Sequence, residues 1–283
     1  MFAAQLKNEL WKLAAKQRTY IGFVVFVTAQ VLMLLMFRHT RWQNDFERLL
    51  GLNGYLAADY LSALTVGLIM LAPQLGLLLP LYVALIGGDM IAKEAEDGTL
   101  RMILSRPISR FRLLVVKWLA GIVFTAVLVV ALGTISVVFA RLTFPWKGLF
   151  VFMQDPLSGN RTFGLFEPGE GLALYAVSQI FVAINTTALL SLALMFSCFN
   201  MKPATATILT LSCVFVSTVL EHIPFFERYQ RWFITYHLAS WTWVFQKPTS
   251  WPQIMQSEIV LAAVAVSAFL VGAAGFHSRD IKS

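Results

Sequence analysis

The sequence predicts an all-α integral membrane protein, and two observations carry this prediction. Hydrophobic residues occupy 58% of the 283 positions and charged residues only 13%, whereas soluble domains have roughly 45–50% and about 25%. Six stretches, each about as long as a helix that crosses a bilayer, contain no Asp, Glu, Lys, Arg or His. We therefore expect a single transmembrane domain, residues 1–283, with six transmembrane helices.

The charge-free stretches set the limits of the predicted spans. These are about 19–37, 61–88, 118–140, 172–200, 203–220 and 259–276. Pro73 and Pro80 should kink the second span, because each removes a backbone donor. Lys202 alone separates the fourth and fifth spans, which together are too long for one crossing. A tight turn at 200–203 is therefore expected, and reading this region as one span would give five.

The distribution of basic residues predicts the orientation. An even number of spans places both termini on one side of the membrane. That side carries 13 of the 22 lysines and arginines in the shorter total length of loop, and such an excess marks the cytoplasmic side. The net charge of +7 also falls there, so it indicates orientation and no nucleic-acid partner is expected.

Two segments outside the spans are predicted to lie at the membrane interfaces. In residues 1–18, apolar side chains recur at helical spacing among lysines, which predicts an amphipathic helix on the cytoplasmic leaflet. A helix packed on another part of the protein is the alternative. Residues 221–258 are rich in Trp and Tyr, which favour the headgroup zone. Short external interfacial helices are therefore expected before span 6.

The cytoplasmic loop 93–117 concentrates charge in an otherwise apolar chain. Acidic residues precede Gly98-Thr99, which predicts a break followed by a short helix, and Pro107 should end that helix. Ser109 can then cap the helix that leads into span 3. The loop would display both apolar and charged groups below the membrane. The alternative is a basic loop that serves only to fix topology.

This loop resembles the hallmark of ABC exporter permeases of the ABC-2 class. The family pattern is roughly E-x-x-x-G-T-L, a few residues, then L-x-x-P-[IV]-S-R and a Lys at the start of the third span. Here residues 94–100 read EAEDGTL, residues 104–110 read LSRPISR, and Lys117 follows. The tail 276–281 is similar to the family ending F-x-R-R-D-I, with Ser278 in place of one Arg. The resemblance covers the layout of the whole chain and, in motifs, about 30 residues.

The resemblance implies a six-span permease subunit that forms a homodimer or pairs with a homologous permease. It also implies a multi-pass protein of the bacterial cytoplasmic membrane. The loop between spans 2 and 3 would form a coupling helix in a cleft of a separate ATPase subunit, which binds ATP and Mg²⁺. No cofactor, metal or catalytic residue is expected in this chain, which has no phosphate-binding G-x-x-x-x-G-K motif.

The resemblance also implies which residues contact the ATPase. They are Glu94, Glu96, Gly98, Thr99, Leu100, Leu104, Arg106, Pro107, Ser109 and Arg110. Leu100 and Leu104 would be apolar knobs, with the acidic and basic residues setting orientation. Lys117 is instead expected to anchor span 3 at the lipid headgroups by snorkelling.

Polar residues within the spans are the candidates for a translocation path. They are Gln30, Gln74, Gln179, Asn185 and Thr187. Hydrogen bonding between neighbouring helices is the alternative role for each of them. The absence of ionisable residues from the spans argues against an ion-coupled carrier and favours an apolar or amphipathic cargo.

Two other functional classes stay open on the residues alone. An intramembrane enzyme would need a base or metal site at membrane depth, but the four histidines lie in loops and no H-E-x-x-H motif occurs. A non-transporting membrane anchor or sensor that recruits a soluble partner would share the layout of the spans. The presence or absence of an ATPase among co-purifying proteins distinguishes it from a permease.

Overall fold

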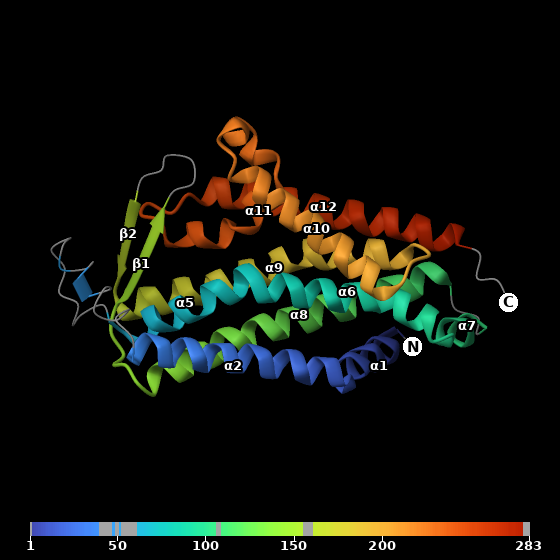
Figure 1. Ribbon diagram of the computed structural model, residues 1–283, viewed down its shortest axis with the longest axis horizontal. Coiled ribbons are helices and arrows are strands. Elements are labelled where there is room, and N and C mark those ends of the chain that lie inside the picture. The colour runs from blue at the N-terminus through green and yellow to red at the C-terminus, as the bar shows by residue number, and fades with distance from the viewer. Residues whose placement is uncertain are drawn as a thin grey trace.

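A computed structural model describes residues 2–39, 47–48, 51, 61–105, 109–154 and 161–279. In these residues six helical segments are long and apolar enough to cross a membrane, as predicted. They are α2 (Gln17–His39), α5 to α6 (Ala63–Glu96), α8 (Arg110–Arg141), α9 (Pro168–Cys198), α10 (Pro203–Glu221) and α12 (Trp251–Ser278). The long helices run side by side along the long axis of the molecule (Figure 1).

The second segment consists of three helical pieces. These are α5 (Ala63–Pro73), the π-helical η1 (Gln74–Leu78) and α6 (Leu79–Glu96). Proline has no N–H and interrupts the helical hydrogen-bond ladder, and the wider π-helical turn follows Pro73 directly. The irregularity expected from the prolines is therefore a π-helical turn, a feature that is often found at functional sites.

The turn between α9 and α10 settles the number of spans. α9 ends at Cys198 and α10 begins at Pro203, because proline is well suited to the first helical position. Arg279 donates hydrogen bonds to the Phe199 carbonyl and to Asn200 Oδ1, at 3.4 and 2.9 Å. The helical hairpin expected at this point is present, and the described residues contain six candidate spans instead of five.

Helix α9 lies at the centre of the bundle and packs against α6, α8, α10 and α12. Gly87 and Gly88 let α6 approach its neighbours closely. A Cβ on Gly87 would lie 2.5 Å from the Ala193 Cβ, and one on Gly88 would lie 2.6 Å from Thr207 Oγ1. Small residues at helix crossings allow such backbone contacts in membrane proteins, so this glycine pair fixes α6 against α9 and α10.

One end of the bundle carries a β-hairpin, which the all-α prediction did not include. Strands β1 (Leu149–Gln154) and β2 (Arg161–Phe166) pair antiparallel, with Leu149 opposite Phe166. The backbone N–H of Phe150 donates to Thr65 Oγ1 at 3.0 Å, which ties the hairpin to the start of α5. The correction is local, and the protein remains almost entirely helical.

Short helices fill the segment between α10 and α12. They are η2 (Pro224–Trp232), α11 (Ile234–Leu238) and η3 (Ser240–Phe245), and part of this segment stands out from the bundle (Figure 1). Trp232 is largely exposed, whereas Trp243 is buried. The short helices expected here are present, and their position at a membrane interface stays a prediction.

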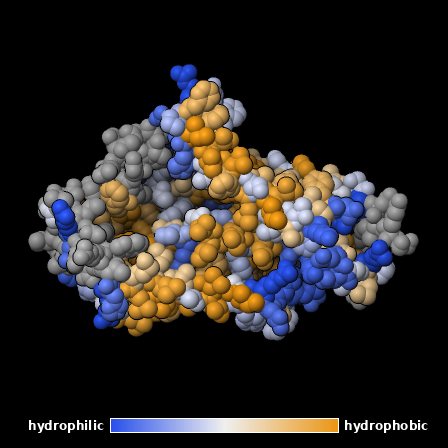
Figure 2. Space-filling model, in the orientation of Figure 1, coloured by the Kyte–Doolittle hydropathy of each residue, from blue (hydrophilic) through white to orange (hydrophobic). Residues whose placement is uncertain are grey.

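The amphipathic helix α1 (Phe2–Ala15), the short helix α7 (Thr99–Leu104) and the last turn of α12 lie together at the other end of the bundle (Figure 1). We call this the α7 end, and the opposite one the hairpin end. Figure 2 shows hydrophobic residues over the middle of the molecule and hydrophilic residues gathered toward the α7 end.

Candidate functional site

A turn at Gly98 separates helix α7 from α6. This glycine has a φ of +71°, in the left-handed region, and no atom lies within 4 Å of a Cβ built on it. The backbone conformation is therefore the reason for glycine here. The N–H of Gly98 donates to the Ala95 carbonyl at 3.2 Å, and Thr99 Oγ1 donates to the Glu94 carbonyl at 3.2 Å. These contacts fix the turn between α6 and α7.

The apolar residues of α7 differ in exposure from what the sequence predicted. Leu100 is only 1% exposed and belongs to the main hydrophobic core. Met102, in contrast, is 66% exposed. Leu100 is therefore not an exposed knob, because its side chain anchors α7 to the bundle, whereas Met102 is an exposed apolar residue of α7. The side chain of Leu104, and Arg106 and Pro107 entirely, lie outside the described residues.

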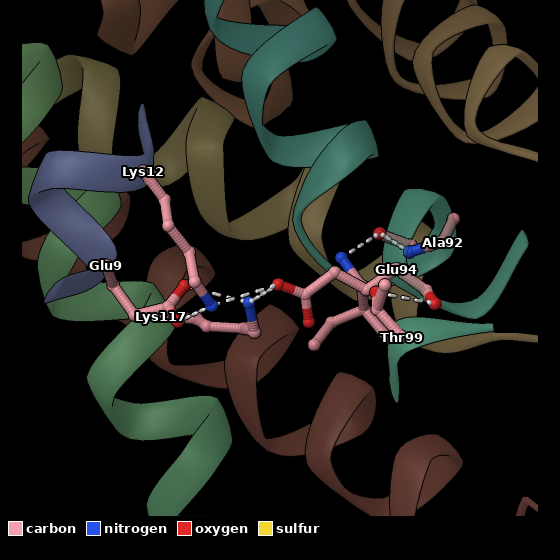
Figure 3. Close-up of polar contacts among 8 residues, drawn as sticks. Glu9, Lys12, Ala92, Glu94, Thr99 and Lys117 are labelled. Carbon is pink, nitrogen blue, oxygen red and sulfur yellow. Dashed lines mark hydrogen bonds and ion pairs between the residues drawn. The ribbon is translucent and has the colours of Figure 1, made fainter. Parts of the chain in front are cut away.

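A buried ion-pair network connects α1, α6 and α8 beside α7 (Figure 3). Lys117 Nζ lies 2.9 Å from Glu9 Oε2 and 2.7 Å from Glu94 Oε1. Lys12 Nζ lies 2.7 Å from Glu9 Oε1 and 3.7 Å from Glu94 Oε1. The expectation that Lys117 snorkels to the headgroups is wrong, since its side chain is 3% exposed and pairs with carboxylates from two other helices.

The network balances two carboxylates against two ammonium groups. Burying a charge is costly unless it is paired and hydrogen-bonded. Burial alone would raise the pKa of Glu9, but the charge of Lys117 and the hydrogen bonds from Lys12 and Lys117 outweigh this effect and hold the pKa below its ordinary value of 4.5. Glu9 is thus a carboxylate at neutral pH, and it ties α1 to α8.

A further ion pair joins the beginning of α2 to α6. Arg18 Nη1 lies 2.5 Å from Asp89 Oδ2, and the Asp89 side chain is 7% exposed. Helix α1 itself packs against α8, while Trp11 on its other side is 73% exposed. The packing of α1 on α8 agrees with the alternative interpretation of residues 1–18, and the position of α1 on the cytoplasmic leaflet stays a prediction.

A groove of about 570 Å³ lies between α1, α7 and the adjoining ends of α6 and α8. Its lining combines amides, charged groups and apolar side chains. The lining residues are Gln5, Asn8, Glu9, Lys12, Glu94, Thr99, Met102, Ile103, Leu113 and Val116. Such a groove can accept side chains of another protein through apolar contact with Met102 and Ile103 and hydrogen bonding to its polar wall.

Other residues predicted to contact the ATPase form contacts within the α7 end itself. Glu96 pairs with Lys93 at 3.0 Å. Ser109 Oγ accepts from a backbone N–H at the start of α8, so the predicted cap is confirmed. Arg110 Nη1 donates to the His277 and Arg279 carbonyls, both at 2.9 Å. Arg110 therefore joins the start of α8 to the end of α12.

The sequence interpretation missed Glu9, Lys12 and Met102 as members of this site. Glu9 is the one acidic residue in the basic N-terminal segment, residues 1–18. This isolated negative charge among basic residues was the only indication in the sequence that Glu9 forms an ion pair. Nothing in the local sequence indicated that the partner would be Lys117.

The polar residues inside the spans mostly bond to the protein itself. Gln30 Nε2 donates to the Leu132 carbonyl at 3.0 Å, and Asn185 Nδ2 donates to Ser240 Oγ at 3.0 Å. Thr187 Oγ1 donates to the Ala183 carbonyl at 3.3 Å. Gln74 and Gln179 are also buried, and their amide groups have no partner in the described part of the chain. Gln30 and Asn185 therefore make the helix-to-helix contacts expected as the alternative, Thr187 bonds within α9, and a path role for Gln74 and Gln179 stays a prediction.

The expectation that no span contains an ionisable residue is wrong for the spans as the structure bounds them, since they include the buried Asp89, Lys117 and Glu258. Helix α12 begins at Trp251, eight residues before the predicted limit, so Glu258 lies inside it. Glu258 is 8% exposed, and its Oε1 accepts a hydrogen bond of 2.9 Å from Ser240 Oγ. The partner hydroxyl from η3 lets this carboxyl group be buried, although the sequence placed it in an external loop.

Comparison with known families supplies an independent test of the sequence resemblance. Residues 6–226 match the family model described as ABC-2 family transporter protein. The chain belongs to this family. It is therefore a multi-pass membrane protein and a permease component of an ABC transporter, and such a component is not itself the ATPase. No curated protein matches the permease.

The matched region of the permease contains most of the features described above. It includes most of α1, the Lys117 network, α7 and five of the six candidate spans. The match identifies the type of protein and assigns no role to individual residues.

Proposed function

We propose that the permease serves in an ATP-driven exporter and that a separate ATPase subunit docks on the α7 end. In this proposal α7 is the coupling helix, the α7 end faces the cytoplasm, and the partner subunit binds ATP and Mg²⁺. One observation carries the proposal. A short helix with an exposed methionine borders a groove open to a partner, while Leu100 and the ion pairs hold that helix and its surroundings to the spans.

The contacts around α7 suggest how its movement reaches the spans. α7 follows α6 after a single turn and is anchored by the buried Leu100. Lys117 on α8 holds Glu94 at the end of α6 and Glu9 on α1. A displacement of α7 would therefore move α6, α8 and α1 together. Coupling between distant sites needs an element of this kind, whose position both sites can bias.

A hydrogen-bond contact from α9 suggests how α6 could respond to a movement of α7. Ser197 Oγ on α9 donates to the Gly88 carbonyl at 2.7 Å and accepts from the Ala92 N–H at 2.8 Å. The Gly88 carbonyl and the Ala92 N–H are four residues apart, which is the separation of acceptor and donor in an α-helical hydrogen bond. An inserted hydroxyl of this kind is a recognised cause of helix bending. It provides a place where α6 can bend when its α7 end is pushed.

The translocation path is proposed to form between two permease subunits, either two copies of this chain or one copy and a homologous permease. Helices α2 and α10 leave most of their apolar side chains exposed in the single chain, including Val24 at 61% and Phe215 at 70%. These surfaces are available to lipid and to a second permease.

Purification of the permease from its native membrane in a mild detergent tests the proposed function. We expect an ATPase subunit in about equal amount and ATP hydrolysis by the purified complex. Recovery of the permease with a soluble partner that lacks ATPase activity would contradict the proposal and favour the anchor or sensor alternative.

A further inference from the structure

A second cavity, of about 400 Å³, shares no lining residue with the groove beside α7. Its walls come from η1 and the start of α6, the last turns of α10, and the short helices α11 and η3. The polar and aromatic residues that matter for recognition are Glu221, His222, Thr235, Trp241 and Trp243. Cavities of this size commonly hold small organic ligands.

One carboxylate, that of Glu221, lines the cavity. Glu221 is half-buried, and its Oε2 accepts a hydrogen bond of 2.5 Å from Thr235 Oγ1. Among the described residues no basic side chain forms an ion pair with Glu221. The other titratable residue of the lining, His222, is exposed. A partly buried carboxylate without a cationic partner favours a ligand that brings a positive charge.

The remaining lining is aromatic and apolar. Indole rings attract cations through their faces more strongly than other aromatic side chains do, and Trp241 and Trp243 both line the cavity. Leu75, Val214 and Leu238 add apolar surface. Thr235 also positions the carboxylate of Glu221 through its hydrogen bond. The hydroxyl of Thr235 is itself hydrogen-bonded to Ser217 Oγ, at 2.9 Å. A carboxylate beside indoles and aliphatic groups suits a cation whose charge is surrounded by apolar substituents.

We propose that this cavity binds an apolar organic cation of the quaternary ammonium or phosphonium type. Glu221 would compensate the charge, and Trp241 and Trp243 would contact the apolar substituents. The proposal goes beyond the function proposed above, because it concerns a ligand site remote from α7. Its binding test requires neither ATP nor the ATPase subunit, so either proposal can fail without the other.

Two ions of nearly the same shape and opposite charge test this site. The permease is reconstituted in nanodiscs, and binding of tetraphenylphosphonium and tetraphenylborate is measured by equilibrium dialysis, with empty nanodiscs as the blank. We expect the phosphonium to bind at least about tenfold more tightly than the borate. Glu221→Gln should weaken phosphonium binding by about tenfold, as expected for losing one favourable charge contact. Glu227→Gln, outside the cavity lining, is the matched control and should change nothing.

A second variant keeps the test decisive if loss of the Thr235 contact impairs folding of Glu221→Gln. Trp241→Leu retains the carboxylate and removes an indole, and it should also weaken phosphonium binding several-fold. Equal binding of the two ions after subtraction of the blank would overturn the proposal. So would unchanged phosphonium binding in folded Glu221→Gln or in folded Trp241→Leu.

Discussion

Replacing Lys117 with Met is expected to lower the free energy of unfolding of the permease by about 3–5 kcal/mol, the usual cost of removing one partner from a buried ion pair. Methionine keeps most of the apolar stem but removes the ammonium group that contacts Glu9 and Glu94 at 2.9 and 2.7 Å. The two carboxylates would then keep only the half-exposed Lys12 as an ion-pair partner in the described residues, with Lys16 lining the same small cavity. Denaturant unfolding in detergent micelles measures the loss.

Lys93→Met is the matched control for this prediction. Lys93 forms ion pairs of 3.0 Å with Glu96 and Asp97, but these residues are exposed. Exposed pairs contribute little to stability, so the control should unfold close to the wild type. Adding Glu9→Gln and Glu94→Gln to Lys117→Met should restore part of the lost stability. A Lys117→Met protein no less stable than Lys93→Met would refute the role given to the network.

The pH dependence of stability provides a second readout of the same network. The pKa of Glu9 is lowered in the folded protein from 4.5, so its contribution to stability is present above that value. It should be lost as the pH falls below 4.5 and through the folded-state pKa. The Glu9→Gln variant should show a shallower loss of stability over this acidic range.

Replacing Met102 with Asp is expected to weaken binding of the ATPase subunit by about 30-fold or more, the effect of losing one apolar hot spot in an interface. Met102 is 66% exposed and lines the groove beside α7, so a carboxylate there should disturb the partner contact and leave the permease folded. Met102→Leu keeps an apolar side chain of similar volume and should bind almost normally. Co-purification of the ATPase with each variant measures the difference.

The position of Leu100 explains why Met102 is the better test. Leu100→Asp would place a charge in the core, because Leu100 is 1% exposed, and it would destabilise the permease itself. Loss of the ATPase from that variant would therefore have two explanations. Normal ATPase binding and export in folded Met102→Asp would contradict the assignment of α7 as the docking surface.

The features that the sequence predicted correctly are set by local chemistry. Charge-free length located the six candidate spans, Pro203 marked the start of α10, and Ser109 marked the start of α8. In each case the signal and the structure it determines lie within one segment. The exposed and buried faces of the six-residue α7 were not predictable in this way, because they depend on which helices pack against it.

The features that the sequence did not predict depend on contacts between distant segments. Glu9 and Lys117 are 108 residues apart in the chain, and no periodicity indicates that such a pair will meet. Glu258 was placed outside the last span because it is charged, but the Ser240 hydroxyl from another segment lets it be buried in α12. In both cases a charged residue was assumed to lie near water, and a partner from elsewhere in the fold reverses that assumption.

Site-specific photo-crosslinking in native membranes tests the proposed docking of an ATPase on α7 most directly. A photoreactive residue at Met102 is compared with one at Met255, which is 52% exposed but lies near the opposite end of the bundle in α12. We predict a crosslinked product with an ATPase subunit from position 102 and none from position 255. No ATPase product from position 102, in a membrane where the transporter is assembled and active, would contradict the account.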